Sequence, residues 1–277
     1  MTTEKYVAIS PTEPCGMCGY IWQVLRTIYS IPNEKYYIDF SNCIYKSGVD
    51  NINTWDHFFH QPDIDFIESI DQVKLVSGTI FSEDNEFIHE LIQPNTKENV
   101  QKRREEYNDI IKRNLKLKDN IQLKLDNFTK LNFDGNKILG LHIRATDHPH
   151  RNDDDKEEII KEVESRLEDY DKLFVCSDEQ EKFLNVKNYF GDKVIFYDAL
   201  RSSSNKPLHS HPIYNQSGRN NDENYQYKIA EDVIMESYLM SKTDFLICTT
   251  GSNVNYLSRA LNPNLPSMVL WKGDIIL

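Results

Sequence analysis

Hydrophobic and polar positions follow two different periods along this chain. Short continuous apolar runs rich in Val, Ile and Phe predict buried strands, whereas apolar residues spaced three and four apart predict amphipathic helices. The expected strands cover residues 6–10, 36–39, 73–78, 137–143, 172–176, 194–196, 244–248 and 267–270. The expected helices cover residues 20–31, 85–91, 155–167, 179–189, 227–240 and 253–261, with a long polar helical stretch over 96–131.

Strands and helices alternate cleanly after residue 136, and the strands there are apolar throughout. This pattern predicts a parallel sheet covered by helices on both faces. The first 40 residues begin in the same way, and the Asn- and Gly-containing turn at 132–136 is the best break between the halves. We therefore expect an α/β fold of two Rossmann-like domains, about 1–130 and 136–277, which face a cleft. Such sheets bind ligands at the carboxyl ends of their strands.

The composition narrows the classes of function. A net charge of −12 argues against a surface built to cover nucleic acid, because phosphates require clustered Lys and Arg. No apolar run approaches the roughly 20 residues of a membrane span, and residues 1–10 lack a secretory signal, so we expect a cytoplasmic protein. The five cysteines are odd in number and two of them lie in apolar runs, which predicts buried free thiols.

The predicted strand ends carry polar residues suited to an anion. Strand 137–143 leads into Arg144, strand 172–176 into Asp178, and strand 244–248 into the turn 249–253, which opens a helix. A helix N-terminus offers free N–H groups and a positive dipole, and an arginine grips a phosphate with two bonds. These features predict a diphosphate site. In the alternative interpretation, Arg144 pairs with Asp147 or Asp178, and the turn is only a helix cap.

Four segments resemble the superfamily of α1,6-, α1,2- and protein O-fucosyltransferases. Residues 142–147 read His-Ile-Arg-Ala-Thr-Asp and resemble its His-x-Arg-Arg-Thr-Asp motif. Residues 231–263, with Asp-Phe-Leu-Ile-Cys-Thr at 244–249, resemble a second motif, and residues 177–178 and 197–202 match the segment between the two. The Cys-Gly-rich turn at 15–20 is similar to the one that opens the catalytic region of core α1,6-fucosyltransferases. Residues 40–130 resemble nothing we can name.

The resemblance implies a GT-B fold, a GDP-fucose donor held by the C-terminal domain, inversion at the anomeric carbon, and no metal or other cofactor. It implies that Arg144 grips the β-phosphate, that Ser252 bonds a phosphate oxygen, and that Glu236, with Asp232 as its rival, reads the guanine edge. The remaining donor-binding residues that it implies are Gly16, Gly19, His142, Asp178, Arg201, Thr249, Gly251 and Asn253. The partners are then a nucleotide sugar and a glycan acceptor.

The sequence departs from the family pattern at two places. The second arginine of the motif is Ala145 here, which removes one phosphate or acceptor contact. The proposed general base of the family falls in a region without a clear Glu, so that Asp153 is the candidate and His150 its rival. Donor ionisation assisted by Arg144 would lessen the need for a strong base.

Several other signals have alternative interpretations. Cys15 and Cys18 form a Cys-x-x-Cys before a helix, as in dithiol redox proteins, and with Cys43 and His57 they offer a weaker zinc hypothesis. His57 and His60 flank two phenylalanines, which are either buried rings beside a surface pair or an acceptor-sugar wall. The loop 201–224 is either a lid or an insertion. The basic residues of 96–131 are interleaved with acids and predict a solvated helical linker. A different nucleotide-sugar donor also remains open.

Overall fold

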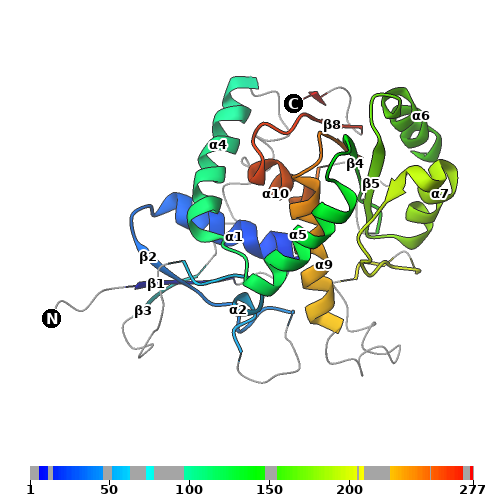
Figure 1. Cartoon of the computed structure of the whole chain (residues 1–277). Coiled ribbons are helices and arrows are strands. Elements are labelled where there is room, and N and C mark those ends of the chain that lie inside the picture. Colours follow the sequence, from blue (N-terminus) through cyan, green and yellow to red (C-terminus); the bar gives the residue numbers. More distant parts are fainter. Residues whose placement is uncertain are drawn as a thin grey trace.

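The computed structural model describes residues 6–11, 15–45, 52–62, 73–77, 97–146, 155–204, 206–208, 225–249, 251–270 and 275–276. Its strands form two separate sheets, and helices lie between and around them (Figure 1). The smaller sheet has the order β2-β1-β3, with β1 at Tyr6–Ser10, β2 at Lys35–Ile38 and β3 at Val73–Ser77. Both of its strand pairs are parallel.

The larger sheet has the order β6-β5-β4-β7-β8-β9. Its strands are β4 (Ile138–Ile143), β5 (Lys172–Ser177), β6 (Val194–Ile195), β7 (Phe245–Cys248), β8 (Ser267–Val269) and β9 (Ile275–Ile276). All of its strand pairs are parallel except β8 with β9, which are antiparallel. Strand β9 was not predicted from the sequence. The predicted α/β class with parallel sheets is confirmed, while the domain boundaries stay a prediction.

Side-chain alternation along β4 and β5 divides the core around the larger sheet. Leu173 and Val175 face the helices α6 (Asp155–Leu167) and α7 (Gln180–Phe190), which cover one face. Phe174 and Cys176 face the opposite side, in one continuous core with α5 (Asp119–Asn132), α9 (Tyr225–Met240) and α10 (Asn253–Leu261). This arrangement is visible in Figure 1, where α6 and α7 lie on the outer side of β4 and β5.

Helix α1 (Met17–Ser30) joins the two halves of the molecule. Every residue from Met17 to Ile28 is buried, because the helix packs against α4 (Lys97–Asn114), α9 and α10 as well as β1. The helix begins at Met17, three residues before the start predicted from apolar spacing. Its N-terminus therefore comes directly after the Cys-Gly turn rather than beyond it.

The stretch predicted as one polar helix is two helices, and it is not a solvated linker. Helix α4 ends at Asn114 and α5 begins at Asp119, and between them Leu117 forms an isolated bridge with Phe59. One face of α4 is buried against α10 and α1. The buried positions of α4 include Val100, Arg104, Tyr107 and Ile111, a helical stripe in which one member is an arginine. The linker interpretation failed because it counted charges along the chain rather than by face.

The two phenylalanines between His57 and His60 are core residues. Phe58 and Phe59 have no exposed surface, and they adjoin the short helix α2 (Trp55–Phe58). The Phe58 ring stacks on Tyr227 with centroids 4.9 Å apart, and His57 meets the same ring edge-on. The prediction of buried rings is confirmed, while an acceptor wall at the histidines stays a prediction.

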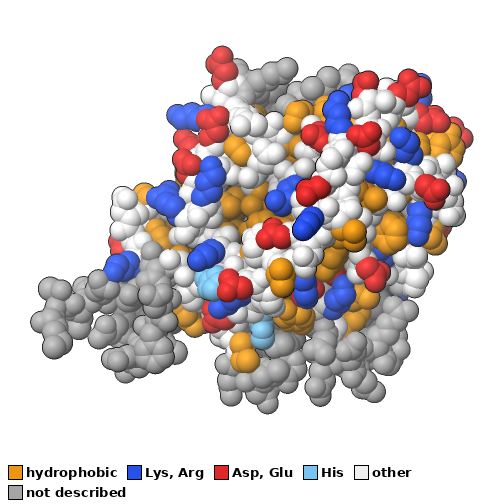
Figure 2. Space-filling view, in the orientation of Figure 1, with side chains coloured by type: hydrophobic (Ala, Val, Ile, Leu, Met, Phe, Trp, Pro, Cys, Tyr) orange, Lys and Arg blue, Asp and Glu red, His pale blue; other side chains and the backbone are white. Residues whose placement is uncertain are grey.

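The visible surface mixes charges of both signs. Figure 2 shows Lys and Arg interspersed with Asp and Glu over this face of the molecule rather than gathered into a basic patch. Within the described ranges, none of the helices combines the length and apolar character that crossing a bilayer requires.

Candidate functional site

A pocket of about 420 Å³ opens where the N-termini of α1 and α10 meet the carboxyl edge of the larger sheet. From the N-terminal half it is lined by residues 15–19 and Tyr45, and from the C-terminal half by Arg144, Asp178 and residues 252–254, with Leu208, Ile229 and Val233 completing the wall. Two helix N-termini directed at one pocket supply free N–H groups and two positive dipole ends. The pocket therefore favours a negatively charged ligand.

The N-terminus of α10 is built by the Ser-Asn spacing of its first turn. Ser252 is the N-cap, and its Oγ accepts the Asn255 N–H at 3.5 Å. Asn255 Oδ1 in return accepts the Ser252 N–H at 3.4 Å, which completes a reciprocal capping box. The cap fixes the turn so that Ser252 and Asn253 stay at the pocket wall.

Arg144 is held at the end of β4 by two neighbouring strands. Its backbone N–H donates to Thr249 Oγ1 at 3.1 Å, and its Nη1 donates to Asp178 Oδ2 at 2.6 Å. Asp178 also accepts the Ala145 N–H at 2.9 Å and the Thr146 hydroxyl at 2.7 Å. The pairing of Arg144 with Asp178, one of the partners given in the alternative interpretation, is thus present in the structure. The same bonds hold the guanidinium at the pocket.

Three side chains stand in a row on the sheet face behind the pocket. His142 pairs in register with Cys176 on β5 and with Cys248 on β7. Burial lowers the pKa of His142 to about 4, and Arg144 and Arg259 lower it further while Asp178 opposes them. His142 is therefore neutral at pH 7. It does not line the pocket, and its Nδ1 has no hydrogen-bond partner among the described residues.

Glu236 and Arg201 form a buried pair beside this row. Arg201 Nη2 lies 3.6 Å from Glu236 Oε1, and the guanidinium packs over the Phe183 ring with its Cζ 4.0 Å from the centroid. Burial raises the pKa of Glu236 to about 8, and the charge of Arg201 opposes this shift. Neither side chain lines the pocket, so a role for them in reading a base stays a prediction.

Asp232, the rival of Glu236, has different partners one turn earlier on α9. Its carboxylate accepts the Leu200 N–H at 2.9 Å and pairs with Lys228. Asp232 therefore fixes the segment that precedes Arg201. A ligand would have to displace these bonds before Asp232 could bind it.

The N-terminus of α1 shows why glycine stands at position 19. A Cβ there would lie 2.7 Å from Cys15 Sγ, closer than real Cβ atoms approach, and 3.3 Å from Asn253 Nδ2, which is a tight contact. The missing side chain thus makes room for Cys15 and for the first turn of α10. A Cβ added at Gly16 would lie 3.9 Å from the Tyr45 hydroxyl, an ordinary contact, and that hydroxyl accepts the Met17 N–H at 3.0 Å.

The two thiols at this turn lie in different environments. Cys15 and Cys18 are not joined in a disulfide, and burial raises the pKa of Cys18 to about 12. Cys18 Sγ contacts the Ser237 hydroxyl at 3.3 Å, and Gln23 Nε2 donates to Cys15 Sγ at 3.2 Å. Redox motifs lower the pKa of the first thiol of the pair, here Cys15, so the raised pKa of Cys18 does not decide the redox hypothesis, which stays open.

The predicted residues fall into three groups in the structure. Gly16, Gly19, Arg144, Asp178, Ser252 and Asn253 line one pocket, while their binding of a ligand stays a prediction. His142, Thr249 and Glu236 are buried behind it, the Arg201 side chain lies beside Glu236, and Gly251 adjoins the Ser252 cap. Asp153, His150 and most of the loop 201–224 lie outside the described residues.

Sequence reasoning missed the contributions of Tyr45, Leu208, Ile229 and Val233 to this pocket. Ile229 and Val233 are four residues apart on α9. This spacing predicts a shared helix face but does not indicate that the face lines a pocket. Tyr45 comes from the segment that matches no known motif, and only its tertiary placement brings its hydroxyl to the start of α1.

The fold and the pocket together define a class: an α/β protein with two mainly parallel sheets and a pocket that is lined by residues from both halves of the chain. Among solved structures, it is similar to the NodZ α1,6-fucosyltransferase soaked with GDP-fucose, with a TM-score of 0.54, 15% identity, and coverage of 96% of this chain and 95% of that one. The fucosyltransferase NodZ from Bradyrhizobium gives a TM-score of 0.54 at 17% identity over 99% of this chain and 98% of that one.

A plant enzyme shows the same likeness. A mutant of Arabidopsis thaliana FUT1 in complex with GDP gives a TM-score of 0.58 at 9% identity, over 98% of this chain and 72% of that one. The predicted GT-B-like fold, and the fold-level resemblance to fucosyltransferases, are thus confirmed. No protein-family model and no curated protein sequence matches the chain.

Proposed function

We propose that this protein is an inverting glycosyltransferase that moves L-fucose from GDP-fucose to a hydroxyl group of a glycan acceptor. The fold is that of NodZ, which has been soaked with GDP-fucose, and of FUT1, which has been solved with GDP. The similarity in fold supports a sugar-transfer reaction, and the residues that line the pocket support the roles proposed for them.

The observation that carries the proposal is the convergence of two helix N-termini and Arg144 on one pocket. The pocket's volume of about 420 Å³ falls within the range of small-molecule sites, roughly 300–1,000 Å³. A diphosphate at the N-terminus of α10 would receive N–H groups from the Ser252 turn. The guanidinium of Arg144 would then grip the β-phosphate with two bonds.

In the proposed reaction the acceptor hydroxyl attacks the anomeric carbon from the face opposite the diphosphate. A new C–O bond forms, the bond to the β-phosphate oxygen breaks, and GDP leaves with the electron pair. Arg144 and the Ser252 turn stabilise the charge that develops on the departing diphosphate. The hydroxyl proton passes to a base, for which Asp153 is the candidate and His150 the rival.

Two residues have roles that depend on the donor. Arg144 already faces the pocket but donates to Asp178, so donor binding requires it to share or exchange that partner. Glu236 remains our candidate for the guanine edge, with the residues about 136–277 holding the donor and the residues about 1–130 the acceptor. We expect transfer without a metal ion.

The direct test is turnover with radiolabelled GDP-fucose and an array of glycan acceptors. The proposal predicts release of GDP together with a fucosylated product whose anomeric configuration is inverted. Arg144→Ala protein that retains its fold should form no product. Sugar transfer from UDP- or ADP-linked donors but not from GDP-fucose would instead assign a transferase with a different donor.

A further inference from the structure

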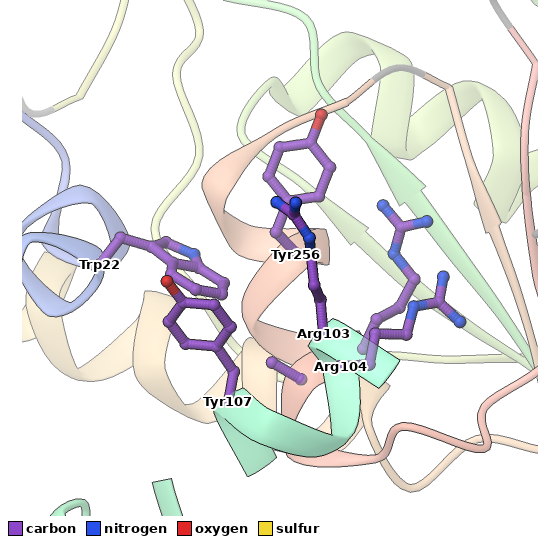
Figure 3. A pocket seen from close by; sticks show the side chains of 7 residues that line it. Trp22, Arg103, Arg104, Tyr107 and Tyr256 are labelled. Carbon is purple, nitrogen blue, oxygen red and sulfur yellow. The ribbon is translucent and has the colours of Figure 1, made fainter. Parts of the chain in front are cut away.

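Two arginines are buried next to each other where α4 packs on α10. Arg104 on α4 is 5% exposed and Arg259 on α10 is 2% exposed. Both line a water-sized cavity of about 10 Å³ with Trp22, Tyr107 and Tyr256. Figure 3 shows Arg104 on α4, on the far side of Arg103 from the rings of Trp22 and Tyr107.

Neither guanidinium is neutralised within the described residues. No carboxylate there pairs with Arg104 or Arg259, and Nε and Nη2 of Arg104 and Nη1 of Arg259 have no hydrogen-bond partner. Burial lowers the pKa of Arg104 to about 9, and the neighbouring charge of Arg259 adds to this shift. Buried positive charge is unfavourable without a counter-ion, so the pair would favour an anion bound nearby.

The pair is connected to the candidate donor pocket through Asn255. Arg259 Nη2 donates to Asn255 Oδ1 at 3.2 Å, and its Nε donates to the Asn255 carbonyl at 3.3 Å. The same Oδ1 accepts the Ser252 N–H at 3.4 Å. Arg259 thus begins in the last turn of α10 and reaches back to the cap at the first turn.

The charges also act on the strand ends beneath the pocket. Burial raises the pKa of Cys248, at the end of β7, to about 11, and both Arg259 and Arg104 oppose that rise. The charge of Arg259 likewise lowers the pKa of His142 at the end of β4. The positive field of the pair therefore extends to the edge where Arg144 and Ser252 face the ligand.

We propose that Arg104 and Arg259 are the built-in counter-charge for the donor's diphosphate, and that Arg259 is a positioning residue that fixes the Ser252 turn through Asn255. This inference rests on the proposed function. Neither arginine touches the donor; both act from behind the turn, across a region where screening by water is weak. Fixed charge of this kind is oriented before the diphosphate binds. It therefore also stabilises the negative charge that grows on the diphosphate as GDP leaves.

The test compares Arg104→Met with Arg104→Lys in the full chain. Methionine keeps an unbranched side chain and removes the charge, whereas lysine keeps the charge. Arg113→Met, at the exposed end of the same helix, is the matched control for loss of one charge. Calorimetry measures the affinity of each variant for GDP and for guanosine, which lacks the phosphates, and thermal unfolding without nucleotide measures the melting temperature.

We expect Arg104→Met to weaken GDP binding by on the order of tenfold, as a unit charge in a partly screened interior would. Guanosine binding should be unchanged, and the melting temperature should rise because an uncompensated buried charge has been removed. Arg104→Lys and Arg113→Met should bind GDP as the unchanged protein does. If Arg104 served only in packing, the melting temperature of Arg104→Met would fall instead, because any change of side chain would disturb the packing.

The position of Arg259 has its own variant. Arg259→Met should weaken GDP binding more than Arg104→Met does, since it removes both the charge and the bond that fixes Asn255. Asn255→Leu removes the bond between Asn255 and Arg259 but keeps the charge of Arg259. Its affinity for GDP should therefore fall less than that of Arg259→Met. Equal losses in the two variants would contradict the charge role of Arg259.

Three results would overturn the inference. The first is that Arg104→Met binds GDP as tightly as the unchanged protein, and the second is that it loses GDP and guanosine affinity equally. The third is that chloride or inorganic phosphate stabilises the unchanged protein, but not Arg104→Met, while GDP affinity is the same in both. Failure of the unchanged protein to bind GDP at all is a separate outcome that removes the proposed function itself.

Discussion

Arg144 and Asp178 come from the ends of neighbouring strands and are joined by a bond of 2.6 Å between Nη1 and Oδ2. Asp178 also accepts from the backbone of Ala145 and from the Thr146 hydroxyl, so that one carboxylate organises the whole turn after β4. The side chains of the pair are 20% and 16% exposed, which leaves the guanidinium accessible from the pocket. The arginine is thus oriented before any diphosphate binds.

Replacing Arg144 with alanine should abolish transfer while the fold persists. We expect kcat to fall by about 10²–10³-fold or more, the loss seen when a donor to a developing oxyanion is removed. The free energy of unfolding should fall by only about 1–3 kcal/mol, as for loss of one charged hydrogen bond. Steady-state kinetics and urea unfolding measure the two quantities. Arg144→Lys, which keeps a charge without the planar fork, should retain intermediate activity.

Glu236 should make stability depend on pH. Burial raises its pKa from 4.5 to about 8 in the folded protein, so the folded state binds a proton more tightly than the unfolded chain does. The contribution of this group to the free energy of unfolding is therefore fully present below about pH 4.5, and it is lost as the pH rises toward 8. Glu236→Gln should gain stability relative to the unchanged protein over that window. Urea unfolding at pH 5 and pH 8.5 measures the difference, and a constant difference would contradict the assignment.

The same carboxyl group offers a test of base recognition. If Glu236 accepts hydrogen bonds from the guanine edge as a carboxylate, GDP binding at pH 7 must release the proton that burial retains. Calorimetry in buffers of different ionisation enthalpy detects that proton. Glu236→Ala should also weaken GDP far more than UDP. If Asp232→Ala does so instead, the recognition residue lies one turn earlier on α9.

Gly19→Ala should destabilise the protein although alanine favours helices. The added Cβ would lie 2.7 Å from Cys15 Sγ, and overpacking of this kind costs about 1–3 kcal/mol. Cys15→Ala removes that sulfur and should recover part of the loss, which a double-mutant cycle of unfolding free energies measures. Purely additive effects of the two substitutions would show that the contact does not govern this position.

Cys18 should be unreactive in the folded protein. Burial raises the pKa of its thiol to about 12, so almost no thiolate is present at pH 8. Alkylation followed by mass spectrometry should label Cys18 only after denaturation. Rapid labelling of Cys18 in the folded state would contradict this prediction, and a disulfide with Cys15 formed under mild oxidation would support the redox hypothesis.

Much of the C-terminal half follows from the sequence because its signals are local. The apolar runs of β4, β5 and β7 and the cap at Ser252 are each readable within a few residues, and α6 and α10 occupy the predicted ranges. The pocket was foreseeable in part, because the carboxyl ends of parallel strands must share an edge. The convergence of Arg144, Asp178 and Ser252 is a consequence of that rule.

What the sequence did not predict depends on tertiary placement. Arg104 belongs to a run of basic and acidic residues typical of a solvated helix, and its burial follows only from the packing of α4 on α10. The break between α4 and α5 was missed because Leu115 continues the helical spacing of Tyr107 and Ile111, while the bridge of Leu117 to Phe59 is a long-range contact. Strand β9 is too short to give a pattern of its own.

The most direct test of the central claim is a calorimetric titration of the protein with GDP, UDP and ADP, first without metal and then with magnesium. We predict micromolar or tighter binding of GDP, much weaker binding of UDP and ADP, and no change when magnesium is added. Failure of all three nucleotides to bind would contradict the claim that the two helix N-termini and Arg144 form a nucleotide-sugar site.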